Sequence, residues 1–171
     1  CSGCVATMIP CSNALGTYDQ PVLKRAIHLM KYQGQRGIGI ELGQYLAKQI
    51  PVDSYDLVVP VPLHWRRKLE RGYNQAAILA QQFPKPWLPA VRKRRHTARQ
   101  ATLNREERLH NLDHVFIVPK HYQPLIRGRR VLLVDDVLST GATTAACTTA
   151  LQAAGAASVL VAVVAQNISP K

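Results

Sequence analysis

The apolar and polar positions along the chain follow two periods, one typical of buried strands and one typical of amphipathic helices. Runs rich in β-branched residues predict strands over residues 57–61, 115–118, 131–135 and 159–164. Apolar residues at helical spacing predict helices over residues 21–32, 38–49, 74–83 and 143–154. Gly155 follows the last helix at the position where a left-handed residue commonly ends one. This alternation predicts an α/β domain with a mostly parallel sheet.

The predicted strand at residues 131–135 ends in two adjacent carboxylates, Asp135 and Asp136. Small residues then lead into an alanine-rich helix, and they are Ser139, Thr140, Gly141, Ala142 and Thr143. Carboxylates accept hydrogen bonds from hydroxyl groups, and the backbone N–H groups at a helix N-terminus bind phosphate. Because both halves stand side by side in the chain, the segment predicts a site for a phosphorylated sugar.

Other classes of site fit this segment less well. A Walker-type P-loop is excluded, because no Gly-Lys-Ser/Thr follows the strand. A phospho-acceptor receiver domain carries such an acid pair near its start, whereas only about 35 residues follow here, enough for one helix and one strand. A plain strand and turn with solvated acids is the remaining alternative.

Composition and charge narrow the class of protein. The chain has 171 residues, of which 47% are hydrophobic, which is enough to bury one core. No apolar run approaches the length of a bilayer span and no signal-like start is present, so we expect a cytoplasmic protein without membrane insertion. The 22 Lys and Arg outnumber the 10 Asp and Glu, giving a net charge of +12. Such a field favours nucleic acid or phosphorylated ligands, with a merely solvated basic surface as the alternative.

The cysteines indicate a metal site rather than disulfides. Cys1 and Cys4 form a Cys-x-x-Cys pair, and Cys11 follows. A structural zinc site needs four ligands, so zinc at Cys1 and Cys4 requires a second pair that this chain, which starts at Cys1 without an initiator Met, does not contain. Free reduced thiols are the alternative. Cys147, on a predicted helix, is interpreted as a small buried hydrophobic residue.

Residues 131–144 resemble the phosphoribosyl-pyrophosphate (PRPP) signature of type I phosphoribosyltransferases, and the whole chain resembles the ComF/GntX family of phosphoribosyltransferase-like proteins. Three further segments carry this resemblance in the family's order: residues 57–63 with Arg66 and Arg67, residues 71–75 (Arg-Gly-Tyr-Asn-Gln), and residues 99–103 followed by Arg105, Arg108 and Asn111. The resemblance implies a type I phosphoribosyltransferase-like fold at residues 18–171, with a central sheet flanked by helices and a small N-terminal helical hood. Residues 1–17 would then be the remnant of a Cys-rich, zinc-binding segment.

The resemblance also implies roles for individual residues. Asp135 and Asp136 would hold the ribose hydroxyls, directly or through Mg²⁺, and residues 139–143 would wrap the 5′-phosphate. Pro62, Leu63 and Arg66 would bind pyrophosphate. Arg99 and Arg105 belong to a segment that closes over PRPP, and they are the predicted catalytic residues.

Two functional classes stay open at this point. The ComF resemblance implies a protein of natural transformation (competence) that binds PRPP, handles incoming single-stranded DNA and works with DNA-processing proteins. Its predicted nucleic-acid contacts are Arg67, Lys68, Arg71, Tyr73, Arg94 and Arg95. Tyr73 is equally consistent with a core tyrosine, and Asn74 with a helix N-cap. The alternative is a genuine phosphoribosyltransferase acting on a nitrogenous acceptor, for which the chain carries no acceptor signature. Resembling transferases often form homodimers.

Overall fold

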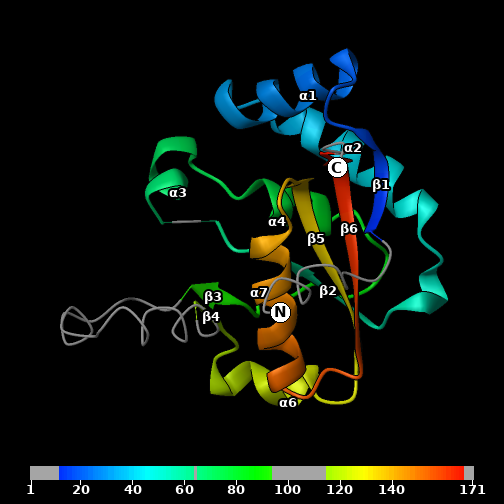
Figure 1. The fold of residues 1–171 in the computed structure, drawn as a ribbon, viewed down its shortest axis with the longest axis vertical. Helices are drawn as coiled ribbons and strands as arrows, with labels where there is room; N and C mark the ends of the chain where they lie inside the picture. The colour runs from blue at the N-terminus through cyan, green and yellow to red at the C-terminus, as the bar shows by residue number, and fades with distance from the viewer. Residues whose placement is uncertain (1–11, 64, 94–114, 168–171) are drawn as a thin grey trace, which may run out of the picture.

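The computed structural model describes residues 12–63, 65–93 and 115–167, and all structural statements below concern those residues. Their centre is a four-stranded sheet with the strand order β1-β6-β5-β2 (Figure 1). Its members are β1 (Ser12–Thr17), β2 (Leu57–Pro60), β5 (Arg130–Leu138) and β6 (Ser158–Gln166). Every pair in it is parallel, as the sequence pattern predicts. Trp87 adds a single parallel bridge to Val58 at the β2 edge.

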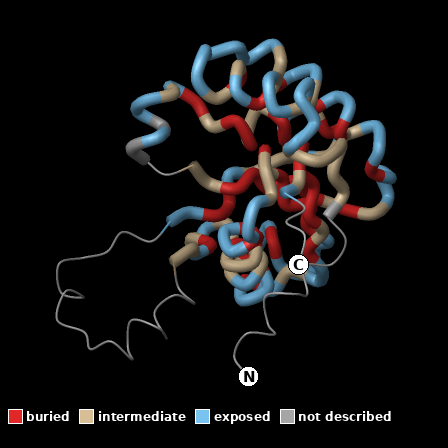
Figure 2. Tube along the Cα trace, turned by 45° about the horizontal axis from the view of Figure 1, so that its top comes forward, coloured by how far each residue is buried: buried red, intermediate tan, exposed pale blue. Residues whose placement is uncertain are grey.

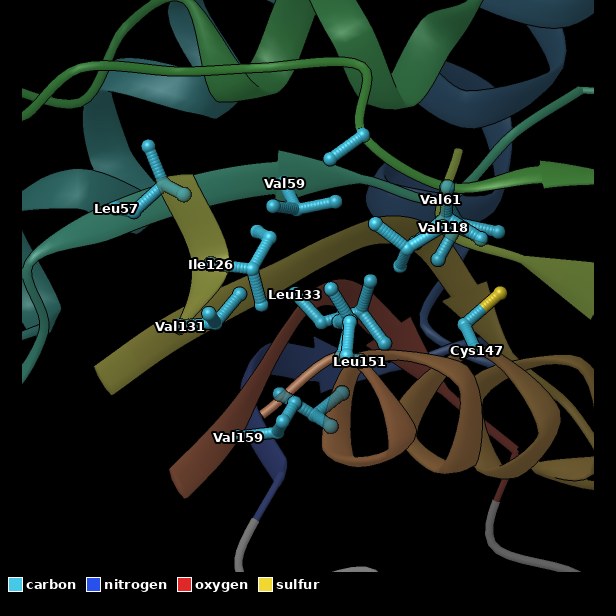
Figure 3. Close-up of a cluster of buried hydrophobic side chains, with 14 of the residues drawn as sticks. Leu57, Val59, Val61, Val118, Ile126, Val131, Leu133, Cys147, Leu151 and Val159 are labelled. Carbon is cyan, nitrogen blue, oxygen red and sulfur yellow. The ribbon is translucent and has the colours of Figure 1, made fainter. Parts of the chain in front are cut away.

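Helices cover both faces of the sheet, which explains why β2 and the central parts of β5 and β6 are apolar at successive positions. On one face, Cys147 and Leu151 of α7 (Ala142–Ala153) pack against Val131, Leu133 and other buried residues of the strands. Figure 3 shows this cluster between α7 and the sheet. On the other face, the alternate strand residues Leu132 and Val134 form a second cluster. Figure 2 shows the buried residues gathered in the interior and the exposed ones along the outer turns.

The second cluster is covered by α1 (Pro21–Tyr32), α2 (Arg36–Gln49) and α4 (Gln75–Ala80). Helices α2 and α4 approach closely at Gly43, where an added Cβ would lie 3.0 Å from Leu79 O. Helix α7 ends as predicted, because Gly155 takes a left-handed φ of 91°. The Ala156 N–H then donates to Leu151 O and the Gly155 N–H to Gln152 O, the pattern of a Schellman cap.

Several elements differ from the sequence expectations. Strand β1 joins the sheet, although residues 12–17 are grouped by sequence with the Cys-rich segment. The basic stretch after residue 64 forms helix α3 (Trp65–Arg71), which apolar spacing does not predict. Strand β4 (Phe116–Ile117) pairs antiparallel with β3 (Arg92–Lys93), outside the central sheet. Short 3-10 helices η2 (Val52–Ser54) and η5 (Lys120–Tyr122) and the one-turn α6 (Gln123–Ile126) complete the described elements.

The length of β5 is the difference that shapes the site. The acid pair does not end this strand, because β5 stays paired with β6 as far as Leu138, opposite Gln166. Strand β2 stops opposite Val134, so β5 is open on that side at Asp135 and Asp136. Helix α4, which comes after β2 in the chain, packs on one face of the sheet. Helix α7, which follows β5, packs on the other face. Ligands of open α/β sheets bind in the crevice that forms where the helices after two neighbouring strands lie on opposite faces of the sheet.

None of the helices in residues 12–63, 65–93 and 115–167 has the length and apolar content that a membrane span requires.

Candidate functional site

A cavity of about 650 Å³ lies at the carboxyl ends of β5 and β2. The sheet supplies Asp135 and Asp136, the loop after β2 supplies Val61, Pro62 and Leu63, and the entrance to α7 supplies Ser139 and Thr143. Tyr18, Phe116 and Asn167 complete part of its rim. Residues 61–63 and 135–143, which are far apart in sequence, therefore open into one space, of a size typical of small-ligand sites.

The two carboxylates have different surroundings. The backbone N–H of Asp136 donates to Asp135 Oδ1 at 2.8 Å, and Lys31 Nζ of α1 lies 3.0 Å from Asp136 Oδ1. Burial, together with the neighbouring charge of Asp136, raises the pKa of Asp135 to about 7. The site therefore holds one carboxylate with a cationic partner and one whose ionised form the fold disfavours.

The entrance to α7 offers the features of a phosphate site. Gly141 precedes the helix with a left-handed φ of 75°, which a residue with a side chain adopts only at a cost. The Ala142 N–H reaches Thr140 Oγ1 at 3.4 Å, and the twelve-residue helix directs its positive dipole end at the cavity. Of the predicted phosphate residues, Ser139 and Thr143 line the cavity, and Thr140, Gly141 and Ala142 form the turn between them.

The loop after β2 is held in place by Asn74. Its Nδ2 donates to Val61 O at 3.0 Å, and its Oδ1 accepts from the Ala76 N–H at 3.1 Å. Asn74 is thus the N-cap of α4, the role that its position in the sequence predicts. The backbone N–H of Val61 also donates to Val134 O on β5. These bonds place Pro62 and Leu63, two predicted pyrophosphate residues, on the cavity wall.

Cationic side chains outnumber the acids around the cavity. Lys31, Arg67, Arg71 and Lys93 line it among the described residues, against Asp135 and Asp136. Arg67 and Arg71, predicted to contact nucleic acid, therefore stand beside the acid pair. Lys31 and Lys93 are not identified by sequence, because no motif marks them and only the tertiary fold brings α1 and β3 to this space.

The other predicted residues are placed as follows. Arg66 and Lys68 lie on α3, next to Arg67 in the chain. Those outside the described residues are Arg94, Arg95, Arg99, Arg105, Cys1 and Cys4. Within the described residues, no three His, Cys, Asp or Glu side chains form a metal cluster. Cys147 is a buried free thiol, as expected, and burial raises its pKa.

Tyr73 is a core tyrosine, which corrects its assignment to nucleic-acid contact. It is 9% exposed, its hydroxyl donates to the Met30 carbonyl, and Arg36 Cζ lies 4.8 Å from the ring centroid. A base could not stack on a ring that α1 and Arg36 cover. Burial also raises the pKa of the hydroxyl.

Gln75 is a site residue whose role sequence reasoning missed. Its side chain lines the cavity but is only 1% exposed. Its Oε1 accepts from Arg71 Nη1 at 3.4 Å, while Nε2 has no hydrogen-bond partner among the described residues. An unpaired buried donor costs about 1–3 kcal/mol, so Gln75 Nε2 is a candidate to donate to a ligand oxygen when the cavity is occupied.

Replacing Gln75 by Met is expected to separate stability from binding. Met has a similar length without the unpaired donor, so we expect unfolding to cost about 1 kcal/mol more. Affinity for an anionic ligand of the cavity should fall about tenfold, as a lost hydrogen bond to a charged group implies. Thermal melts and calorimetric titration measure the two effects. Gln82→Met is the matched control, because Gln82 Nε2 already donates to Ile78 O and lies off the cavity. A destabilised Gln75→Met chain with unchanged affinity would contradict this role.

Comparisons with known proteins agree with this geometry. Residues 69–171 match the family described as the phosphoribosyl transferase domain. A solved structure described as the allosteric regulatory enzyme of purine biosynthesis superposes with a TM-score of 0.53 and 26% identity, over 73% of this chain and 25% of the other. The Bacillus subtilis glutamine PRPP amidotransferase, at 24% identity and a TM-score of 0.53, shows the same fold. Fold and cavity together define a type I phosphoribosyltransferase-like protein.

Curated relatives narrow the family. Competence protein F of Haemophilus influenzae is 37% identical over 144 residues, which are 75% of this chain and 61% of the relative. DNA utilization protein YhgH of Escherichia coli is 31% identical over 94% of this chain and 75% of its own length. Competence protein ComFC of Bacillus subtilis is 30% identical over 74% of this chain and 52% of its own. The chain belongs to the ComF family of phosphoribosyltransferase-like proteins.

Proposed function

We propose that this chain binds PRPP with Mg²⁺ in the 650 Å³ cavity and handles single-stranded DNA during natural transformation. One observation carries the PRPP half. A pair of carboxylates and the N-terminus of α7 open into a single cavity whose charged lining is mainly cationic. A ligand that bears both ribose hydroxyls and phosphates suits that lining better than a plain anion does, because a plain anion gains nothing from the acids.

Each part of the cavity would contact a different group of PRPP. Asp135 and Asp136 accept hydrogen bonds from the ribose hydroxyls. The turn from Ser139 to Thr143 binds the 5′-phosphate through backbone N–H and hydroxyl groups. The loop at Pro62 and Leu63 receives the pyrophosphate, with Arg67 and Arg71 beside it, since guanidinium groups suit bidentate phosphate contacts.

The donor set suits a magnesium ion that arrives with the ligand. Two carboxylates with hard oxygens are available, whereas a resident metal needs more protein ligands than the described residues bring together. When bound, Mg²⁺ supplies positive charge that neutralises the pyrophosphate. A zinc ion at Cys1 and Cys4 is a further part of the proposal and concerns residues outside those described.

The DNA half rests on the relatives and on charge. Relatives of this chain are named for competence and for DNA utilization, and the net charge of +12 favours a polyanionic partner. The chain spans 61% of competence protein F, so the role of the whole relative enters here as a proposal.

A genuine phosphoribosyltransferase is the second candidate, and Gln75 favours it. A carbonyl group on a nitrogenous acceptor could accept from the unpartnered Nε2 of this side chain. Release of pyrophosphate from PRPP in the presence of free bases would establish this activity. Arg99 and Arg105 are then the residues proposed to stabilise the departing pyrophosphate.

Calorimetric titration of the purified chain tests the proposal. PRPP with Mg²⁺ is expected to bind saturably with one molecule per chain, and ribose 5-phosphate more weakly, because it lacks the pyrophosphate that Arg67 and Arg71 would contact. The titration is then repeated with a short single-stranded oligonucleotide present. If PRPP at millimolar concentration gives no heat of binding, the proposed PRPP binding is contradicted, whereas the proposed DNA handling is not tested by that result.

A further inference from the structure

We propose that the exposed face of α1 is a binding surface for single-stranded nucleic acid, on which one base stacks against Tyr32. The inference rests on the proposed DNA-handling role and names the surface that performs it. Neither the family resemblance nor the sequence motifs assign Tyr32, and the predicted stacking residue, Tyr73, is buried.

Tyr32 has the surroundings of a stacking platform. It ends α1 and is 66% exposed, although Tyr55 and Tyr73 are buried in the same domain. Arg71 Cζ lies 5.1 Å from its ring centroid, and the His28 ring lies 4.8 Å away in a tilted arrangement. The residue as a whole stays mostly exposed beside both neighbours. Aromatic rings with adjacent cations are the usual platform for unpaired bases, and each stacked base contributes about 1–3 kcal/mol.

The rest of this face suits the phosphates. Lys24, His28 and Tyr32 recur at helical spacing and are all exposed, as is Arg25. The sequence of α1 contains no acidic residue that would repel a polyanion. A hollow of about 460 Å³ runs beside these side chains, lined by Lys24, Arg25, His28 and their neighbours on α1 and Gln33. A backbone lying in that hollow would bring its phosphates to the cations and leave its bases free to reach Tyr32.

The surface leads directly to the cavity. Arg71 both lies over Tyr32 and lines the cavity, and Lys31, the neighbour of Tyr32 in the chain, pairs with Asp136 inside it. Figure 1 shows the C-terminal end of α1 and α3 on the same side of the molecule. A strand that crosses α1 would therefore end at the mouth of the proposed PRPP site. Bound PRPP and bound DNA would share Arg71.

Fluorescence anisotropy with a labelled oligo-deoxythymidylate tests the proposal in the full chain. Tyr32→Ala is expected to weaken binding about tenfold, as loss of one stacked base implies, whereas Tyr32→Phe should keep it. The matched control is Tyr45→Ala on α2. Tyr45 is 62% exposed with Lys48 Nζ 5.6 Å from its ring, but it stands away from the cavity. Its loss should leave the affinity unchanged.

A second pair of variants tests the phosphate contacts independently. Wild-type affinity should fall steeply with salt, and Lys24→Ala with Arg25→Ala should reduce that slope by roughly 0.7 for each phosphate contact removed. PRPP affinity should not change in Tyr45→Ala or in Lys24→Ala with Arg25→Ala, because the substituted residues lie outside the cavity lining.

Three outcomes would overturn the inference. Equal losses for Tyr32→Ala and Tyr45→Ala would mean that the surface is not specific. If the wild type binds DNA and Tyr32→Ala binds it with the same affinity, the nucleic acid binds at another surface, and the proposed function is unaffected. Failure of the wild type to bind DNA at low salt would remove the DNA-handling role together with this surface.

Discussion

Replacing Asp135 and Asp136 together by Asn is expected to lower the affinity for PRPP by about 10²–10⁴-fold. Each carboxylate would contribute a charge-assisted hydrogen bond of about 1.5–3 kcal/mol to the ribose hydroxyls or to their Mg²⁺, and both are lost at once. Asn keeps the size of Asp and an Oδ1 that can accept from the backbone N–H of residue 136, which Asp135 Oδ1 accepts now. Calorimetric titration with PRPP and Mg²⁺ measures the change.

Controls separate this loss from a general effect of charge. Asp53→Asn removes an exposed carboxylate away from the cavity and should leave PRPP affinity unaltered. Lys31→Met removes the partner of Asp136 and one cation of the cavity, so its loss should be smaller than that of the acid pair. A folded double variant that binds PRPP as tightly as the wild type would refute the site assignment.

The sequence locates the acid pair and the turn before α7 well because both are local features. Asp135, Asp136 and residues 139–143 are consecutive in the chain, and the element on each side of them has a clear period. Helix α7 lies within one residue of its predicted bounds for the same reason. Gly155 marks its end through a backbone conformation that glycine adopts without cost.

The parts that sequence does not reveal depend on contacts between distant segments. Strand β5 continues beyond Asp135 and Asp136 because β6 stays paired with it. The sequence of β5 alone does not predict this extension. Strand β1 has a weak pattern of its own and is recognised only through its partner, β6. The Lys31–Asp136 ion pair joins segments about a hundred residues apart, and packing alone buries Tyr73 and exposes Tyr32. Sequence therefore locates the acids and the turn before α7, while the fold determines which cations and aromatic rings lie beside them.

Asp135→Asn alone is expected to stabilise the protein, and more at pH 8 than at pH 5. The pKa of Asp135 is raised from 3.8 to about 7 in the folded chain, first by burial and then by the charge of Asp136. Between those values the folded state holds a proton that the unfolded state has released. The free energy of unfolding of the wild type therefore falls as pH rises through this window, by roughly 1.4 kcal/mol per pKa unit, and levels off above pH 7.

Asn carries no charge to bury, so the variant escapes this loss, and its melting temperature should exceed that of the wild type by several degrees at pH 8. Asp56→Asn is the contrasting control, because the bonds from Arg130 lower the pKa of Asp56. Its contribution to stability is present above the ordinary pKa of Asp, so its loss should be equal at pH 5 and pH 8. Thermal melts of both variants between pH 5 and pH 8 measure these differences. A gain in melting temperature of Asp135→Asn over the wild type that does not grow with pH would contradict the raised pKa of Asp135. The fold destabilises the ionised form of Asp135, and a ribose phosphate that carries Mg²⁺ would stabilise that charge. Asp135 therefore links the pH dependence of folding to the pH dependence of ligand binding.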